Sequence, residues 1–406
     1  MAAHLVFGLL WSVNLAWAAT PGEIQNYLKT QLSSSSEVVL SSSQAYTTEI
    51  KQRWDAYDPP SFVVVVKPAT ANDVATIVRY TSSNSIPFMG TGGGHGYTTT
   101  TSALKNGINI DLSGFKEVSI DFAASTMTIG GAVTFVEVLN PTGSCSCVGM
   151  VGATIGGGIG VHQGLHGLII DALQSVTVVT GNGDVNFGLI TSATYKLHDQ
   201  TNRGQALNGD FLSQVSANAT IFNALKSFTR NQPDAFAVTS AIQYSHTLNT
   251  VVTMVSAVYV GPEKDGRKIL QPLLSVKAFK SNVTMIPYNR LPQPAYDMNL
   301  YPYDVATYQK TLAAYIDFYA TTHLATSYMV TEIFPTRVSL SIPDEATTYP
   351  YRAAMAYLFS GFTTDAQTSA ITKFAKEIRG DFAKLNGAKG LEVYVNYTHG
   401  DEGRNA

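Results

Sequence analysis

The chain has 406 residues, of which 45% are hydrophobic and only 14% are charged, and its formal net charge is −3. A chain of this length and apolar content can bury a large core and form more than one domain. It contains no block of basic residues. A nucleic acid is therefore excluded as an expected partner, because its phosphates require a positively charged stripe on the protein.

Residues 1–20 predict a secretory signal peptide. Leu5 to Trp17 form a short apolar run, and Ala16-Trp17-Ala18 has the small-x-small pattern of a cleavage site. The run is too short to span a bilayer, so we expect no membrane partner and a secreted protein cleaved after residue 18 or 19. A buried N-terminal helix is the alternative. Two sequons, at Asn218 and Asn282, predict N-glycans in that compartment.

Between residues 61 and 200 the sequence predicts short strands, one helix and two glycine-rich loops. The helix, over residues 71–83, begins at a capping box that Thr70 forms with Asp73. The predicted strands lie in the segments SFVVVVKP, IPFMG, GINIDLSG, EVSIDF, TMTIGG, LQSVTVVT and FGLITSATYKL. The two loops are GTGGGHG at 90–96 and GSCSCVGMVGATIGGGIG at 143–160.

After about residue 200 the glycine clusters stop and longer segments follow. We expect a strand in TVVTMVSAVYV, helices over 266–279 and 308–322, and a helix over 366–385 with one apolar face. A final strand is expected in LEVYVNYTHGDEG. The layout predicts two α+β lobes, residues 19–200 and 201–365, with residues 366–406 returning to the first lobe.

The two glycine loops predict a site for one large ligand. Consecutive free N–H groups form concavities that bind anions, so two such loops in one lobe can hold a ligand that carries phosphates. Neither loop continues into a Gly-Lys-Ser/Thr sequence, and neither opens a dinucleotide-binding βαβ unit. Turn or packing glycines are the alternative interpretation. Each loop also brings a reactive side chain, His95 in the first and Cys145 or Cys147 in the second.

At these motifs the chain resembles the secreted FAD-linked oxidases of the vanillyl-alcohol oxidase superfamily, in the fungal branch similar to berberine bridge enzyme. The resemblance rests on GGGHGY at 92–97, on the segments 143–160 and 187–197, and on YVNY at 394–397. It implies an α+β fold with a two-lobed FAD-binding domain of the p-cresol methylhydroxylase (PCMH) type over residues 19–200, and an α+β substrate domain with an antiparallel sheet. It also implies hydride transfer from an alcohol, a sugar or a secondary metabolite to FAD and then to O₂, within secondary metabolite biosynthesis.

The resemblance further implies roles for individual residues. His95 would carry covalently bound FAD, with Cys145 as a second point of attachment, and Cys147 would be a spare buried thiol. Tyr394 and Tyr397 are the candidate catalytic residues, and Asn396 would bind the flavin edge. The other expected cofactor-binding residues are Gly92, Gly93, Gly94, Gly96, Tyr97, Val148, Gly149, Gly152, Gly156, Gly157, Gly158 and Gly160. Cross-strand aromatic packing is the alternative for the two tyrosines, and the residue that takes the substrate proton is left open.

The chain departs from the family pattern at two places. Between Val185 and Asn186 the family carries about twenty more residues, and it continues beyond the final GDEGRNA, so we expect a shortened copy. An alternative hypothesis is therefore a non-catalytic remnant without FAD. A zinc hydrolase based on His162 and His166 is a third hypothesis, but Gln163 stands where a zinc protease has its glutamate, so we expect no metal and two histidines on a helix surface.

Overall fold

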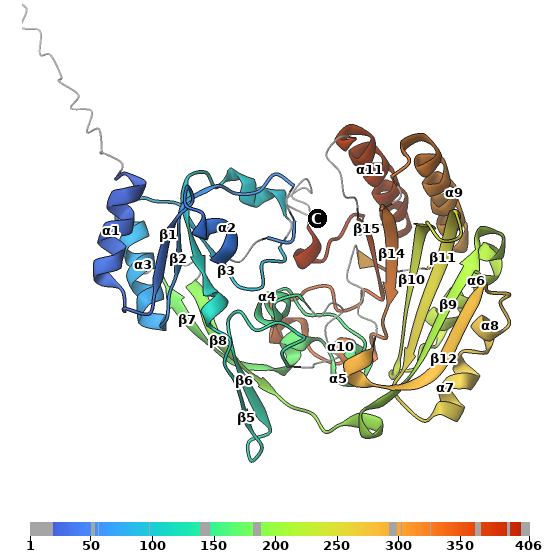
Figure 1. The fold of residues 1–406 in the computed structure, drawn as a ribbon. Helices are drawn as coiled ribbons and strands as arrows, with labels where there is room; N and C mark the ends of the chain where they lie inside the picture. The colour runs from blue at the N-terminus through green and yellow to red at the C-terminus, as the bar shows by residue number, and fades with distance from the viewer. Residues whose placement is uncertain are drawn as a thin grey trace, which may run out of the picture.

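The computed structural model describes residues 19–49, 53–55, 57–96, 98–138, 147–181, 188–291, 299–301, 303–324, 326–361, 367–387 and 390–398. This part of the chain forms two lobes that lie side by side (Figure 1). The expected signal peptide, the junction at Val185 and the last eight residues lie outside the described residues. None of the helices in the described ranges is long and apolar enough to cross a membrane.

The first lobe begins with a four-stranded sheet of order β1-β2-β4-β3, in which β4 runs parallel to β2 and β3. Its β-branched strand β2 is central and buries Val64, Val65 and Val66 completely. Helix α3 spans the predicted residues and starts at the predicted Thr70–Asp73 capping box. The elements are α1 (Pro21–Gln31), β1 (Glu37–Leu40), α2 (Ala45–Glu49), β2 (Phe62–Lys67), α3 (Ala71–Ser83), β3 (Phe88–Thr91), η1 (Thr99–Ala103), β4 (Gly107–Asp111) and η2 (Leu112–Gly114).

A second four-stranded sheet completes this lobe, with the order β5-β6-β8-β7 and antiparallel pairing throughout. Its four strands occur where the alternation of polar and apolar residues predicts them. Short helices connect β6 to β7 and carry the second glycine loop. The elements are β5 (Val118–Asp121), β6 (Thr126–Gly130), α4 (Met150–Ile155), α5 (Gln163–His166), η3 (Ile169–Ala172), β7 (Leu173–Thr180) and β8 (Gly188–Lys196).

The second lobe is an antiparallel sheet of order β12-β9-β11-β10-β14-β15-β13, and α6, α9 and α11 pack on one of its faces (Figure 1). The largest hydrophobic core lies between the sheet and these helices. The elements from residue 201 onward are η4 (Thr201–Gly204), β9 (Gln205–Gln214), η5 (Val215–Ala217), α6 (Asn218–Arg230), β10 (Phe236–Ser245), β11 (Thr250–Tyr259), α7 (Glu263–Ile269), α8 (Gln271–Leu274), β12 (Lys280–Pro287), η6 (Tyr288–Arg290), β13 (Asn299–Leu300), α9 (Val305–Thr322), β14 (Tyr328–Ile333), α10 (Arg337–Leu340), η7 (Asp344–Ala346), β15 (Ala356–Gly361), α11 (Thr368–Leu385) and η9 (Val395–Tyr397).

Three predictions for the second half need correction. The expected helix over 266–279 is divided into α7 and α8, because Pro272 lacks an N–H group and occupies the first turn of a new helix. Helix α11 has the predicted apolar face, but this face packs in the second core, so only the stretch 390–398 reaches the first lobe. The prediction of a final strand in LEVYVNYTHGDEG was wrong, since the described part of this segment contains only the single turn η9.

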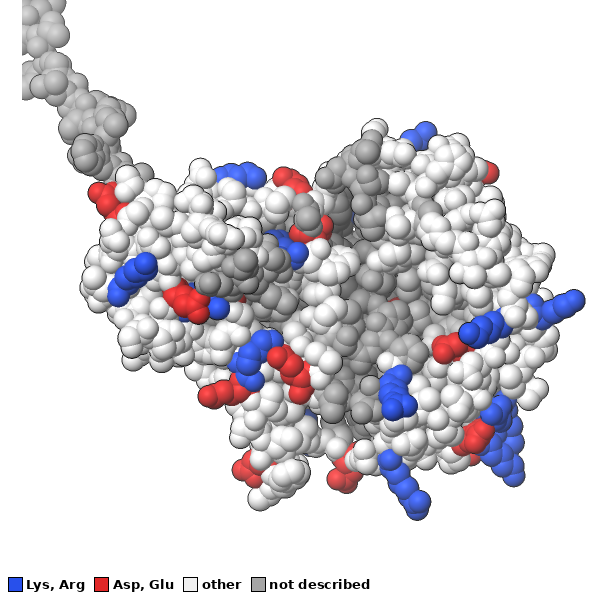
Figure 2. Space-filling view, viewed as in Figure 1, with Lys and Arg blue, Asp and Glu red and all other residues white. Residues whose placement is uncertain are grey.

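The charged side chains on the face shown in Figure 2 lie in small groups, many of which contain both signs. In Figure 2 lysines and arginines alternate with aspartates and glutamates, and neither sign gathers into a large patch on the visible face. This distribution agrees with the small net charge.

Candidate functional site

The two glycine loops lie back to back in the first lobe. A Cβ atom added to Gly93 would lie 2.4 Å from the backbone nitrogen of Gly149, and one added to Gly92 would lie 2.8 Å from the carbonyl oxygen of Gly131. Real side chains do not tolerate such distances, so only glycine allows the two backbones to approach each other this closely. The sequence prediction that both loops serve one site therefore has a direct geometric counterpart.

A cavity of about 430 Å³ runs along both loops. At Gly152 an added Cβ would meet no protein atom within 4 Å, so the backbone there faces open space that a ligand can fill. The predicted site residues that line the cavity are Gly92, Gly93, Gly94, His95, Gly96, Val148, Gly149, Gly152, Gly158, Tyr394 and Asn396.

His95 stands in the cavity wall and stacks on Trp54. The ring centroids are 5.1 Å apart and the planes differ by 19°. The segment with Trp54 also holds the loop, because the Trp54 N–H donates to the Gly94 carbonyl at 2.9 Å and the Arg53 guanidinium donates to the Gly96 carbonyl. The sequence analysis did not predict that Trp54 and Arg53 contact the first glycine loop. Their only signal in the sequence is weak, an aromatic residue and a cation shortly before Pro59-Pro60.

The end of the second loop packs against the second lobe. Gly157 and Gly158 have φ values of +117° and +76°. A Cβ at Gly157 would lie 2.7 Å from the ring of Tyr349, and one at Gly156 would lie 2.2 Å from the Asn396 side chain. Close packing therefore accounts for the glycines at positions 156 and 157. Neither these two residues nor Gly160 line the cavity. The prediction that these three glycines contact a cofactor stays a prediction.

Tyr394 joins the end of the chain to the second glycine loop. Its ring is buried, and its hydroxyl oxygen accepts hydrogen bonds from the Gly158 N–H and from the Asn396 side-chain amide, both at 2.8 Å. Asn396 also donates to the Ala153 carbonyl at 2.9 Å. Because Tyr394 lies on no strand, cross-strand pairing does not account for it. It belongs instead to a tyrosine cluster, with ring centroids 5.8 Å from Tyr349 and 6.1 Å from Tyr357.

Several predicted residues fall outside what the structure describes. Tyr97 and Cys145 lie outside the described residues, as does the side chain of Tyr397. Cys147 is described and is exposed, so the expectation of a buried spare thiol was wrong. Cys147 lies in the loop that leads into α4.

The second lobe contributes a buried carboxyl group that the sequence analysis missed. Glu332 on β14 has no exposed surface, and neither of its oxygens has a hydrogen-bond partner among the described residues. Burial raises its pKa well above the ordinary value. Glu332 pairs with Tyr357 on the neighbouring strand, so both side chains project from the sheet face of the tyrosine cluster. A single acidic residue inside the apolar run YMVTEIF was the signal that could have found it.

The two histidines of the zinc hypothesis lie close together, but no third ligand is grouped with them to hold a metal ion among the described residues. His162 caps α5 and is buried, contrary to the expected helix surface. The rings of His162 and His166 are stacked, with centroids 6.1 Å apart and planes that differ by 18°. In the described ranges, no three His, Cys, Asp or Glu side chains are grouped to hold a metal ion.

Comparison with known proteins relates the chain to FAD-linked oxidoreductases. Residues 62–187 match the model of a family described as "FAD binding domain". The chain is 33% identical to the FAD-linked oxidoreductase azaL of Aspergillus niger, over 95% of this chain and 93% of that protein. It is 35% identical to the FAD-linked oxidoreductase srdI of Neurospora crassa, over 87% of this chain and 80% of that protein.

Solved structures confirm the α+β fold. BBE-like 1 of Physcomitrella patens superimposes with a TM-score of 0.73 at 17% identity, covering 93% of this chain and 91% of its own. The xylooligosaccharide oxidase of Myceliophthora thermophila, solved with xylobiose, superimposes with a TM-score of 0.73 at 16% identity, covering 94% of this chain and 90% of its own. At these identities the likeness concerns the fold alone.

Proposed function

Because this chain belongs to the family of FAD-linked oxidoreductases, we propose that it is an oxidase that carries FAD covalently on His95. Its substrate is an alcohol, a sugar or a secondary metabolite, and its place is in a biosynthetic pathway of secondary metabolism. The observation that supports the proposal best is the contact between Gly93 and Gly149, which brings both glycine loops and His95 to a single cavity.

The residues around the cavity fit this cofactor. The loops offer backbone N–H groups to the pyrophosphate, and the open space at Gly96 and Gly152 allows the ligand to approach the backbone. The imidazole of His95 can attach to the flavin ring, and its stacking on Trp54 limits the orientations that the ring can take. Cys145 is proposed as the second attachment point, because it belongs to the same loop as Val148 and Gly149.

Bound FAD would supply the hydride acceptor, with O₂ as the final electron acceptor, since no side chain of the protein performs this chemistry. The protein's part is to bind and orient the substrate and to handle its proton. Tyr394 is the candidate to take that proton, because its hydroxyl lies in the cavity wall and is fixed by Gly158 and Asn396. Tyr397 remains a second candidate.

We also propose that the protein is secreted, with a small-molecule substrate and no nucleic acid or membrane partner. Of the two predicted glycosylation sites, Asn282 is exposed on the edge strand β12. Asn218 is half-buried, and its side chain donates to Val215 and accepts from Gln309. A glycan is therefore easier to accommodate at Asn282.

The test is an absorption spectrum of the full chain before and after acid precipitation. A yellow pellet supports covalent attachment, whereas a white pellet with a yellow supernatant contradicts it. A colourless protein favours the non-catalytic remnant. His95→Ala should leave at most the linkage through Cys145, and His246→Ala, which changes an exposed histidine in the second lobe, should keep the wild-type spectrum. Release of H₂O₂ from a panel of sugars and aromatic alcohols then identifies the substrate class.

A further inference from the structure

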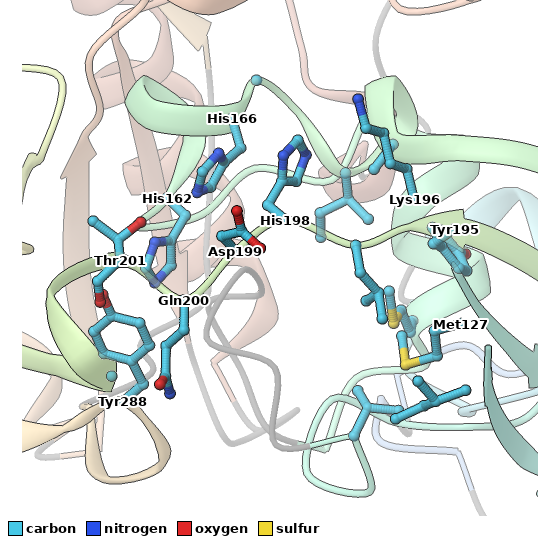
Figure 3. Close-up of a pocket in the computed structure, with 18 of the residues that line it drawn as sticks. Met127, His162, His166, Tyr195, Lys196, His198, Asp199, Gln200, Thr201 and Tyr288 are labelled. Carbon is cyan, nitrogen blue, oxygen red and sulfur yellow. The ribbon is translucent and has the colours of Figure 1, made fainter. Parts of the chain in front are cut away.

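A second cavity lies where the two lobes meet. It has a volume of about 590 Å³, within the range of small-molecule sites. Its wall combines η3, the end of β8 and the linker before β9 with Pro287 and Tyr288 of the second lobe. Figure 3 shows its two ends, one with His162, Thr201 and Tyr288 and the other with Tyr195 and Met127. We call it the histidine cavity.

Three stacked imidazoles form one wall of the histidine cavity. His166 lies between His162 and His198, with ring centroids 6.1 Å and 4.3 Å away and planes within 18° (Figure 3). Burial is the main cause that lowers the pKa of all three histidines, to about 4 for His162. At neutral pH the wall is therefore made of uncharged rings, each with one donor and one acceptor nitrogen.

His162 has an unsatisfied hydrogen-bonding atom. The side chain is 4% exposed, and within the part of the chain that the structure describes its Nε2 has no hydrogen-bond partner. Tyr288 touches the ring edge-on with a centroid distance of 5.0 Å, but its hydroxyl already donates to the Thr201 carbonyl. A buried polar atom without a partner lowers the stability of the protein, so a ligand hydroxyl that bonds to it would remove this penalty.

The opposite end of the cavity is apolar. Met127, Met150, Ile169 and Leu197 line it, and methionine sulfur makes favourable contacts with aromatic rings. The charged residues in the wall are exposed and comprise two cations, Lys196 and Arg203, and one anion, Asp199. Because these charges face solvent, they are screened, and the apolar end with two methionines and the uncharged imidazole wall favour a neutral ligand over an ion.

This cavity is separate from the cavity at the glycine loops. The two share no lining residue, and they lie on opposite sides of α4, where Met150 faces one and Val151 faces the other. Among the described residues, no three His, Cys, Asp or Glu side chains form a group here that could hold a metal ion. A ligand of the histidine cavity would therefore contact residues other than those of the glycine cavity.

We propose that the histidine cavity binds a flat, uncharged aromatic molecule with a hydroxyl group, at a site distinct from the glycine cavity. The aromatic ring lies between the methionines and aliphatic side chains, and the hydroxyl donates to Nε2 of His162. Binding here does not require that the proposed oxidase function is correct, because no residue of the glycine cavity takes part.

The experiment is calorimetric titration of the full-length, purified protein with 2-naphthol. We expect saturable binding of one molecule per chain, and at least about tenfold weaker binding of 2-methoxynaphthalene, which has no donor, because a hydrogen bond to an otherwise unpaired group is worth about that factor. Equal binding of the two compounds, or no binding of 2-naphthol, overturns the proposal.

Variants locate the site. His162→Phe keeps the ring but removes the acceptor and should weaken 2-naphthol binding about tenfold. His198→Leu removes an exposed member of the imidazole wall, so it tests the site even where His162→Phe does not fold. Gly152→Ala, in the glycine cavity, should bind 2-naphthol like the wild type. If Gly152→Ala abolishes binding while both histidine variants retain it, the ligand occupies the glycine cavity and the proposal is wrong.

Discussion

Arg352 and Asp171 form a buried ion pair between the two lobes. The guanidinium donates to both carboxylate oxygens, at 2.8 Å and 3.2 Å, and the two side chains are 2% and 4% exposed. Arg352 also donates to the hydroxyl of Thr347 at 2.6 Å, and Asp171 accepts from the Leu168 N–H at 2.8 Å. The pair thus ties the stretch before β15 to the helical turn η3, which follows the second glycine loop.

Arg352→Met should lower the free energy of unfolding by about 3–5 kcal/mol, because it leaves the Asp171 carboxylate buried without its partner. Urea or thermal unfolding measures this. Lys268→Met is the matched control, since it removes a cation from an exposed pair with Asp265 and should cost less than about 1 kcal/mol. Arg352→Met with Asp171→Leu should be less harmful than the sum of the two single changes. Equal effects of Arg352→Met and Lys268→Met would contradict the buried pair.

Gly93→Ala and Gly152→Ala should separate packing from ligand binding. At Gly93 the new methyl group meets the Gly149 backbone, so the loops move apart and both stability and flavin content fall. At Gly152, within α4, the methyl group meets no protein atom, so stability should be kept or rise by about 1 kcal/mol while flavin content falls. Thermal unfolding and flavin absorbance measure the two effects. Full flavin content in Gly152→Ala would remove this residue from the binding site.

Glu332→Gln should stabilise the protein in a pH-dependent way. The folded state raises the pKa of Glu332, so it binds a proton that the unfolded chain releases above about pH 4.5. The wild type therefore loses stability as pH rises from there to the folded pKa, by up to about 1.4 kcal/mol per pH unit, and glutamine does not titrate. Unfolding at pH 4 and pH 8 should show a gain only at pH 8. Glu345→Gln, at an exposed position, should show no such difference. A loss at pH 8 would mean that the carboxylate has a charged partner.

Tyr394→Phe removes the hydroxyl that Gly158 and Asn396 share. Because two N–H groups lose their acceptor, we expect a loss of about 1–3 kcal/mol in unfolding free energy. If the hydroxyl also handles the substrate proton, the rate of substrate oxidation should fall at saturating substrate by much more than the stability change explains. Tyr27→Phe, at an exposed tyrosine on α1, should change neither quantity. An unchanged oxidation rate would assign Tyr394 a structural role only.

The local parts of the fold could be predicted from the sequence. The β-branched run of β2 and the capping box of α3 are signals that act over a few residues, and both elements occur as expected. The break between α7 and α8 at Pro272 is a local signal as well. The amphipathic pattern on both sides of it nevertheless led to the prediction of one continuous helix. The strand predicted in the final segment was wrong because a contact distant in the sequence determines its structure. Its alternation of apolar and polar residues resembles a strand, yet Tyr394 is fixed by Gly158, 236 residues earlier in the chain.

The candidate site could be predicted only in part. The glycine loops can be located from the sequence, because few other structures require several glycines close together. Nothing near His162 in the sequence predicts that the second lobe will bury it with Tyr288, and nothing near Asp171 predicts Arg352. Glu332 had a signal, but its position beside Tyr357 depends on the strand order of the sheet, which short-range patterns do not contain.

The wall of the glycine cavity combines residues of the first lobe with Tyr394 and Asn396, which come about 200 residues later in the sequence. This order has a consequence for biosynthesis. Tyr394 and Asn396 leave the ribosome long after the glycine loops, so a nascent first lobe has begun to fold while its cavity still lacks one side. Cofactor loading would then be a late event, after residues 394–396 have emerged from the ribosome. A stalled nascent chain ending before residue 390 should stay colourless in a translation extract supplied with flavin.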